Sequence, residues 1–175
     1  MTTTSRLTGD YVIDQANTHL GFVARHTVGP RVRGRFDKVE GHVHLDGQDP
    51  ARSSIAVTIR ADSIETHNRQ RDLHLRTKFF ACADHPVITF TSTTVAALGE
   101  NRFDVTGVLM IRGLTKLVKV RFELFGEQDR RLRFGGTAAV NRMDWGVDWN
   151  VATGMFVSPT VTLHLDVSVY PAATR

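Results

Sequence analysis

The sequence predicts an all-β fold: an extended antiparallel barrel of about eight strands, with one short helical insertion near residues 67–81. Three observations support this prediction. Apolar and polar residues alternate along most of the chain, turn-forming residues separate the alternating segments, and nearly every segment has one apolar face. Alternation with a period of two is typical of strands that have one face in water. Closing the sheet into a barrel buries the apolar faces together and removes the sheet edges.

The strands predicted before the insertion differ in how clearly apolar and polar residues alternate. Weak alternation predicts strands near 10–14 and 19–26, and strong alternation predicts strands at 39–45 and 55–61. Between the last two, the run from Asp46-Gly47 to Asp49-Pro50 is a turn signal.

The strands after the insertion follow the same pattern. Segments 103–111, 118–124 and 161–169 alternate strongly, and weaker strands are expected near 87–95 and 132–140. Turns are predicted at three runs that contain glycine: Leu98–Asn101, Arg112-Gly113 and Gly126–Asp129. Strand and short turn therefore follow one another, as an antiparallel barrel requires.

Small residues recur on the apolar faces of these strands. Gly41, Ala61 and Gly107 occupy positions where bulkier side chains are expected if the interior is solidly filled. They indicate a cavity inside the barrel, although glycine in a strand is equally compatible with a bend or a bulge.

The helical insertion contains the densest group of charged, imidazole and aromatic side chains in the chain. From Asn68, a candidate N-cap, to about Leu75 there is no proline, glycine or β-branched residue, which favours one or two helical turns. The run Asp84-His85-Pro86 ends the segment. We expect this segment to lie across the wall or mouth of the barrel, with its leucines and phenylalanines directed inward.

Length and composition favour one domain. The chain has 175 residues, of which 41% are hydrophobic and 23% charged, enough for one sizeable core. We expect a flexible N-terminal arm over 1–9, one barrel domain over 10–170 and a C-terminal tail over 171–175. The first nine residues contain no apolar stretch that resembles a secretory signal, so we expect a cytoplasmic protein.

The formal net charge is +4, and arginine supplies most of the positive charge. Two clusters of arginines stand out, Arg31, Arg33 and Arg35 in one and Arg130, Arg131 and Arg133 in the other. On a strand the first cluster forms a basic stripe opposite Val32 and Phe36. No aromatic residues alternate with these arginines, so a solvated strand face is favoured and no nucleic-acid partner is expected.

The order of short motifs resembles the YceI-like family. The residues that carry the resemblance are Tyr11–Asp14, Thr18-His19, Gly21–His26, Val32–Phe36, Ser63–Thr66, Arg71–Leu75, Phe79-Phe80, Pro86, Phe90–Ser92 and Gly113–Lys116. The resemblance covers about residues 11 to 169 and implies a lipocalin-like barrel that binds a long isoprenoid or other amphiphilic lipid in an internal tunnel. Leu117 stands where the family usually has proline, and the run 154–159 lacks the glycine-rich loop of many relatives.

The resemblance suggests which residues bind such a lipid. The head-group candidates are Arg25, His26, Arg71 and His74. The tunnel-lining candidates are Phe22, Leu73, Phe79, Phe80, Phe90, Leu109, Trp145 and Trp149. Arginine suits a phosphate head because its guanidinium can make a bidentate contact. For Asp72 a structural role is favoured, as a partner of an arginine or of backbone amides.

The sequence therefore predicts a non-enzymatic lipid-binding protein for storage, transport or sensing of polyprenyl phosphate or isoprenoid quinone, with no cofactor besides that lipid. Transient contact with a membrane surface and a homodimer are also expected. One alternative is a barrel with a filled core that binds a protein partner. The other is a metal-dependent enzyme that uses histidines, because His42 and His44 share a strand face and His74 and His85 flank Cys82. No third metal ligand is evident, so no metal site is predicted.

Overall fold

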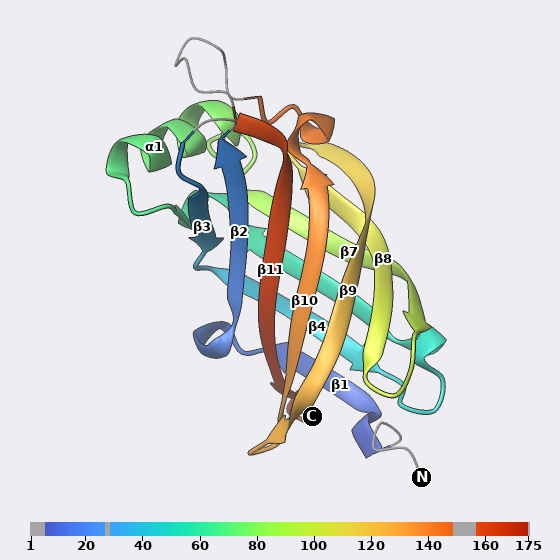
Figure 1. The fold of residues 1–175 in the computed structure, drawn as a ribbon. Coiled ribbons are helices and arrows are strands. Elements are labelled where there is room, and N and C mark those ends of the chain that lie inside the picture. The colour runs from blue at the N-terminus through green and yellow to red at the C-terminus, as the bar shows by residue number, and fades with distance from the viewer. Residues whose placement is uncertain (1–5, 27–28, 149–156, 175) are drawn as a thin grey trace.

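The computed structural model describes residues 6–26, 29–148 and 157–174. Its strands form a single antiparallel sheet in the order β1-β4-β5-β7-β8-β9-β10-β11-β2-β3-β6, and an additional pairing of β1 with β11 closes a ring of eight strands. Figure 1 shows this barrel with helix α1 at its upper end and the start of β1 at its lower end. The prediction of an antiparallel barrel of about eight strands is confirmed.

The strands and helical elements have the following bounds. The first six strands are β1 (Gly9–Ile13), β2 (His19–His26), β3 (Val32–Phe36), β4 (Val39–Leu45), β5 (Ser54–Arg60) and β6 (Ile64–Glu65). The others are β7 (Val87–Ala97), β8 (Arg102–Ile111), β9 (Leu114–Gln128), β10 (Arg131–Asn141) and β11 (Val157–Pro171). The helical elements are α1 (Arg69–His74), the π-helical turn η5 (Leu75–Phe79) and the 3₁₀ turns η2 (Gln15–Asn17), η3 (Pro50–Arg52), η4 (Ala61–Ser63) and η6 (Arg142–Trp145).

Consecutive strands are joined by a short bend in three places, and the three bends lie at the same level of the barrel. The bends are at η2 between β1 and β2, at Asp37-Lys38 between β3 and β4, and at η4 between β5 and β6. Hydrogen bonds join the three bends to one another. The Val39 amide donates to Gln15 Oε1 (3.3 Å), the Asp37 amide to the Ser63 carbonyl (3.3 Å) and the Arg60 amide to the Lys38 carbonyl (2.9 Å). The strands β1, β4 and β5 therefore close the lower half of the barrel, while β2, β3 and β6 continue into the upper half.

The helical insertion occupies the place where the upper half has no ladder. Strand β6 pairs with β3 alone, and β7 pairs with β5 and β8, so α1 and η5 span the distance between β6 and β7. Asn68 caps the helix by accepting a hydrogen bond from the Arg71 amide (2.9 Å). Phe80, just after η5, packs edge-on against Phe36 of β3, with 6.0 Å between the ring centroids. The predicted helix near residues 67–81 is confirmed.

The interior contains two large clusters of buried apolar side chains, and a small third cluster of Ala24 and Val32 packs against Val161. The lower cluster is formed around Ile13, Val43 and Leu132, and the upper cluster around Ile88, Leu109 and Trp145. Aliphatic strand residues supply most of both clusters, as the alternating sequence pattern predicts.

The small inward-facing residues make room for neighbouring groups and not for an open space. A side chain at Gly107 would clash with the ring of Phe90, and one at Gly41 would clash with the Ala56 carbonyl. These glycines allow a bulky ring or a backbone group to approach closely. They are therefore not the origin of any cavity.

The first described residues pack against the lower end of the barrel. Sequence analysis assigns them to a flexible arm, yet Leu7 is only 7% exposed. The Tyr11 hydroxyl donates a hydrogen bond to the Leu7 carbonyl (3.1 Å), and the Gly47 amide donates to Thr8 Oγ1 (3.0 Å). Leu7 lies on the interior side because the barrel end is otherwise an open apolar surface.

Asp14, which lies where β1 ends, is expected to make stability depend on pH. It accepts hydrogen bonds from Asn17 Nδ2 (2.8 Å) and Arg131 Nε (2.9 Å), and these lower its pKa below the usual 3.8. Because the folded pKa is the lower one, this stabilisation is complete above about pH 4 to 5 and is lost as pH falls through the folded pKa.

We predict that Asp14→Asn lowers stability at neutral pH and flattens the loss of stability below about pH 5. Urea unfolding between acidic and neutral pH measures both. Asp129→Asn, at an exposed carboxylate in the β9–β10 turn, is the matched control and should keep the wild-type profile. An unchanged profile for Asp14→Asn would contradict the assignment.

Candidate ligand-binding site

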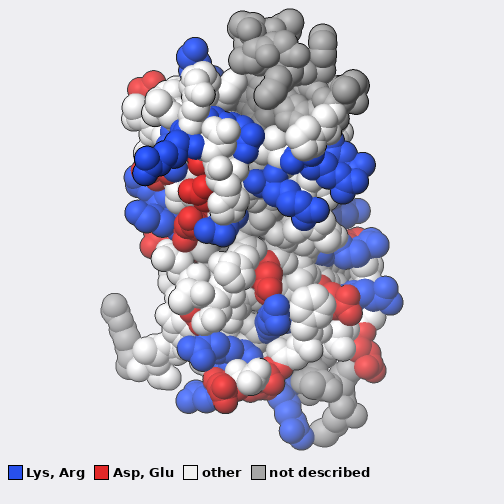
Figure 2. All heavy atoms as spheres, turned by 60° about the vertical axis from the view of Figure 1, so that its left-hand side comes forward, with Lys and Arg blue, Asp and Glu red and all other residues white. Residues whose placement is uncertain are grey.

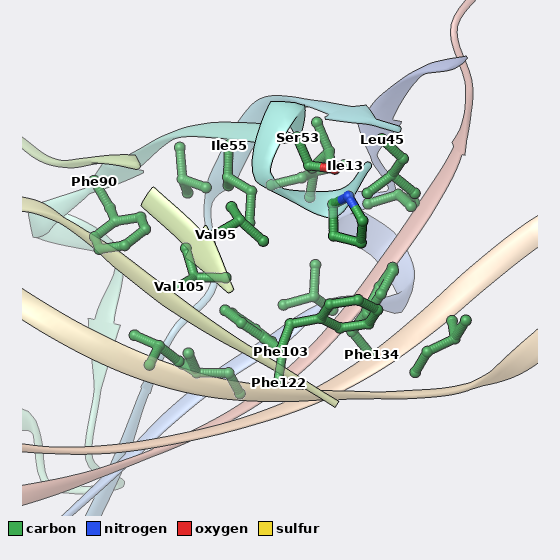
Figure 3. Close-up of a pocket in the computed structure, with 18 of the residues that line it drawn as sticks. Ile13, Leu45, Ser53, Ile55, Phe90, Val95, Phe103, Val105, Phe122 and Phe134 are labelled. Atoms are coloured by element: carbon green, nitrogen blue, oxygen red, sulfur yellow. The ribbon is translucent and has the colours of Figure 1, made fainter. Parts of the chain in front are cut away.

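The lower half of the barrel encloses a cavity of about 170 Å³. Figure 3 shows its apolar lining, with Phe103, Phe122 and Phe134 on one side and Ile55 and Val95 on another. Polar lining occurs only at the rim, at Asp46, Gly47 and Ser53 in the β4–β5 connection. These rim groups bond to each other, since the Asp46 amide donates to Ser53 Oγ (2.9 Å). The cavity can accept an apolar group and offers no polar partner inside.

The upper half contains a second cavity of about 140 Å³. Its lining includes Phe22, Phe36 and Phe80, together with Trp145 of η6. The Trp145 indole nitrogen donates to the Leu109 carbonyl (2.9 Å), so the ring presents only apolar atoms to the space. Five residues line both cavities: Leu20, Ile59, Leu109, Leu163 and Leu165. The two cavities therefore adjoin inside one barrel.

Arg142 is the one charged side chain among the described residues that line the upper cavity. It is 9% exposed, and its guanidinium donates to the Val147 carbonyl (2.6 Å) and the Ser158 carbonyl (3.2 Å). Burial lowers its pKa, and Asp148 partly opposes this effect. Because a guanidinium stays protonated in proteins, the upper cavity has a cation in its wall.

The sequence signal for Arg142 was its position in the alternating pattern. The inward side of β10 carries the even-numbered residues, from Leu132 to Val140. Arg142 is the next residue in this phase. The sequence-based list of lining candidates does not include it.

Five predicted lining residues do line a cavity. Phe22, Phe80 and Trp145 line the upper one, Phe90 the lower one and Leu109 both. Phe79 packs against the upper core cluster without lining the cavity. Trp149 lies outside the described residues.

Leu73 does not line either cavity, and it is 57% exposed. Asp72 of α1 points inward. Leu75 directly follows α1 and lies three positions after Asp72, so it shares the inward face, and it is also buried. At 3.6 residues per turn, Leu73 then points away from the barrel. The apolar residues of this segment form no single stripe in the sequence, so its inward face could not be assigned.

Three of the four predicted head-group residues, Arg25, Arg71 and His74, lie outside the lining. Arg71 donates to Thr66 Oγ1 and to the Thr66 carbonyl, both at 2.8 Å. Arg25 is exposed near the end of β2, and His74 is half-buried on α1. His26 ends β2, and its side chain lies outside the described part of the chain. None of Arg25, Arg71 and His74 is among the residues that line the cavities.

Asp72 fixes the start of the helical insertion. Its carboxylate is 3% exposed and accepts hydrogen bonds from the Thr66 amide (3.0 Å) and the Thr66 hydroxyl (2.5 Å). Asp72 and Arg71 together bond to the amide, the hydroxyl and the carbonyl of Thr66. The structural role expected for Asp72 is confirmed by these contacts.

The groups that suggested metal or thiol chemistry do not assemble into a site. His42 and His44 lie on β4, and His44 Nδ1 is 2.8 Å from Asp10 Oδ1. Within the described residues, no three His, Cys, Asp or Glu side chains come together as metal ligands. Burial raises the pKa of the Cys82 thiol, with Asp62 adding to the effect. Cys82 therefore behaves as a small apolar residue that packs against the upper core cluster.

Positive charge gathers near the α1 end of the molecule. Figure 2 shows lysine and arginine side chains concentrated in the upper half of the face turned towards the viewer, with acidic residues more interspersed below. Arg33 and Arg35 of β3 are exposed, as are Arg69 of α1 and Lys78 of η5. The basic stripe predicted for β3 is present, with Val32 buried on its other side.

A closed antiparallel barrel with apolar internal cavities defines the class of lipocalin-like barrels. The family model described as the YceI-like domain matches residues 11–169, and the chain belongs to this family. A UPF0312 protein of Pseudomonas aeruginosa (strain LESB58) is 33% identical over 149 residues, which cover 81% of this chain and 78% of that protein. A UPF0312 protein of Pectobacterium carotovorum is 35% identical over 128 residues, covering 71% and 66%.

Solved structures share the fold. Burkholderia cenocepacia BcnA superposes with a TM-score of 0.79 at 23% identity, covering 93% of this chain and 99% of that one. A polyisoprenoid binding domain from Saccharophagus degradans has a TM-score of 0.76 at 19% identity, covering 93% and 98%.

No helix among the described residues is long and apolar enough to cross a membrane.

We predict that Asp72→Ala destabilises the barrel by about 1–3 kcal/mol, because it leaves two buried donors of Thr66 without their acceptor. Thermal and urea unfolding would measure the loss. Gln70→Ala changes an exposed residue of the same helix and should have little effect. Equal stability of the two variants would show that the Thr66 contacts contribute nothing.

Proposed function

We propose that this protein binds a long-chain isoprenoid lipid, with a polar or anionic head, inside the barrel and stores, transports or senses it. The observation that carries the proposal is the pair of adjoining apolar cavities inside a closed sheet. Membership of the YceI-like family and the fold shared with a polyisoprenoid binding domain support it. The role proposed is binding and not catalysis.

The tail supplies most of the affinity in this proposal. Burying apolar surface contributes about 0.8 kcal/mol per methylene, so one five-carbon isoprenoid unit contributes roughly 3 to 4 kcal/mol before the costs of binding. The lining offers leucine, isoleucine, valine and phenylalanine in both cavities. A few units therefore outweigh any single contact to a head group.

Arg142 orients the ligand in this proposal. It is the charged group in the wall of the upper cavity, whereas the charged group at the lower rim is the carboxylate of Asp46. A phosphate or a quinone carbonyl accepts hydrogen bonds from a guanidinium. A carboxylate repels the phosphate and offers the carbonyl no hydrogen bond. The head therefore lies at the upper end and the tail points down the barrel.

Loading takes place at a bilayer surface, where the basic upper face meets anionic lipid headgroups. The exposed arginines and lysines near α1 and β3 support this orientation. The homodimer that the family resemblance implies stays a prediction.

The first test is native mass spectrometry of the purified protein, followed by solvent extraction of any bound molecule. We expect a stoichiometric isoprenoid lipid. Val57→Phe, which fills part of the lower cavity, should reduce its occupancy. Val108→Phe, which adds the same ring at a β8 position outside both cavities, should leave occupancy unchanged. A bare protein that also rejects quinones and polyprenyl phosphates would overturn the proposal in favour of a filled barrel.

We predict that Arg142→Met weakens binding of a polyprenyl phosphate by about tenfold or more, since a charged hydrogen bond contributes about 1.5–3 kcal/mol. Binding of the matching headless polyprene should fall much less. Arg142→Lys, which retains the cation, should recover part of the difference. Equal losses for phosphate and headless tail would mean that the role of Arg142 is limited to its bonds with the Val147 and Ser158 carbonyls.

A further inference from the structure

A layer of aliphatic side chains separates the two cavities. We call Leu20, Ile59, Leu109, Leu163 and Leu165, the residues that line both cavities, the septum. They come from β2, β5, β8 and β11. In the ring order, β5 and β8 lie on one side of the barrel, and β11 with β2 lies on the other. The septum therefore crosses the interior from wall to wall.

The packing of the core divides at the same place. The lower and upper clusters of buried residues are separate, and Ile59 and Leu165 are packed against both. Leu165 is directly opposite Leu20 in the β2–β11 ladder. Ile59 and Leu20 flank two of the chain bends, η4 and η2. Packing and backbone geometry thus place the division at one level of the barrel.

The septum is held by packing alone. Its side chains have no polar atoms, and four of the five are leucines, whose rotamers interconvert at modest cost. An apolar tail that pushes them aside replaces one set of dispersion contacts with another. The septum can therefore yield to an apolar chain.

We infer that the septum makes the protein discriminate isoprenoid tails by length, which rests on the proposed function and refines its ligand class. A short tail ends in the upper cavity. A longer tail displaces Ile59 and Leu165 and continues into the lower cavity, which has the larger volume. The favoured ligand is one whose tail is long enough to fill both.

The test is a binding series of isoprenoid quinones that share one ring and differ only in tail length. In the unchanged protein, affinity rises by about 10²- to 10³-fold per added isoprenoid unit before the costs of binding, stays level while the septum is displaced, and then rises again. Leu165→Phe, which thickens the septum, should abolish the second rise and leave the short tails unaffected. Leu165→Ala should remove the level interval.

Matched variants keep the test interpretable. Val108→Phe adds a ring outside both cavities and should reproduce the unchanged protein, and Ile59→Phe thickens the septum from the opposite side if Leu165→Phe fails to fold. An affinity that rises without interruption as the tail lengthens would contradict the inference about the septum alone. Equal losses of affinity for short and long tails in the thickened variants would do the same. Absence of binding by every quinone to the unchanged protein would overturn the proposed function as well.

Discussion

The barrel depends on how one long strand divides its hydrogen bonds. One edge of β11 pairs with β10 along most of its length, while its other edge pairs with β2 above and with β1 below. Between these two ladders the chain turns through η2. There Thr18 replaces a ladder pair, because its hydroxyl donates to the Ser168 carbonyl (3.3 Å) and accepts from the Ser168 amide (3.1 Å). Without this exchange, the Ser168 amide would be unpaired in the interior of the wall, whereas the Ser168 carbonyl also accepts from the Asp14 amide (2.8 Å).

The exchange of partners gives the two halves of the barrel different walls. Below the bends, ladders run around the whole ring. Above them, one part of the wall is α1 and η5, which reach the neighbouring strands through side chains such as Phe80 on Phe36. Two walls of different construction cannot share one uniform core. The two large clusters and the two cavities described above consequently meet at the septum, at the level where the wall changes.

The sequence predicts the strands well because the period of two is a local property of the chain. Strands β4, β8 and β11 lie where their alternation places them. The bends are not local in this sense. Ala61 continues the alternation of β5, yet it already belongs to η4, because hydrogen bonds to the Lys38 and Pro86 carbonyls redirect the chain there. Such bonds join residues far apart in sequence and leave no signal in one strand.

In the candidate site too, the sequence places the residues of regular strands and not those of the short helix. Phe90 and Leu109 could be placed inside the barrel because they belong to regular strands. Leu73 could not, since a helix of six residues presents too few apolar positions to fix its inward face. Sequence analysis sought the polar contact in the conspicuously charged helix, but Arg71 there bonds to Thr66. The charge that lines a cavity is Arg142, the less conspicuous continuation of a strand pattern.

The difference between the two walls also determines which end opens more easily. Opening the lower end requires breaking ladders of β1 with β4 and β11 and withdrawing Leu7 from the apolar interior. Opening the upper end requires moving α1 and η5, which no ladder joins to β7. Local opening is easiest where few backbone hydrogen bonds tie an element to its neighbours. For the proposed function, this favours ligand entry at the upper end, whose cavity has Arg142 in its wall and whose surface carries the positive charge. On that proposed route, the tail meets the septum before it reaches the lower cavity.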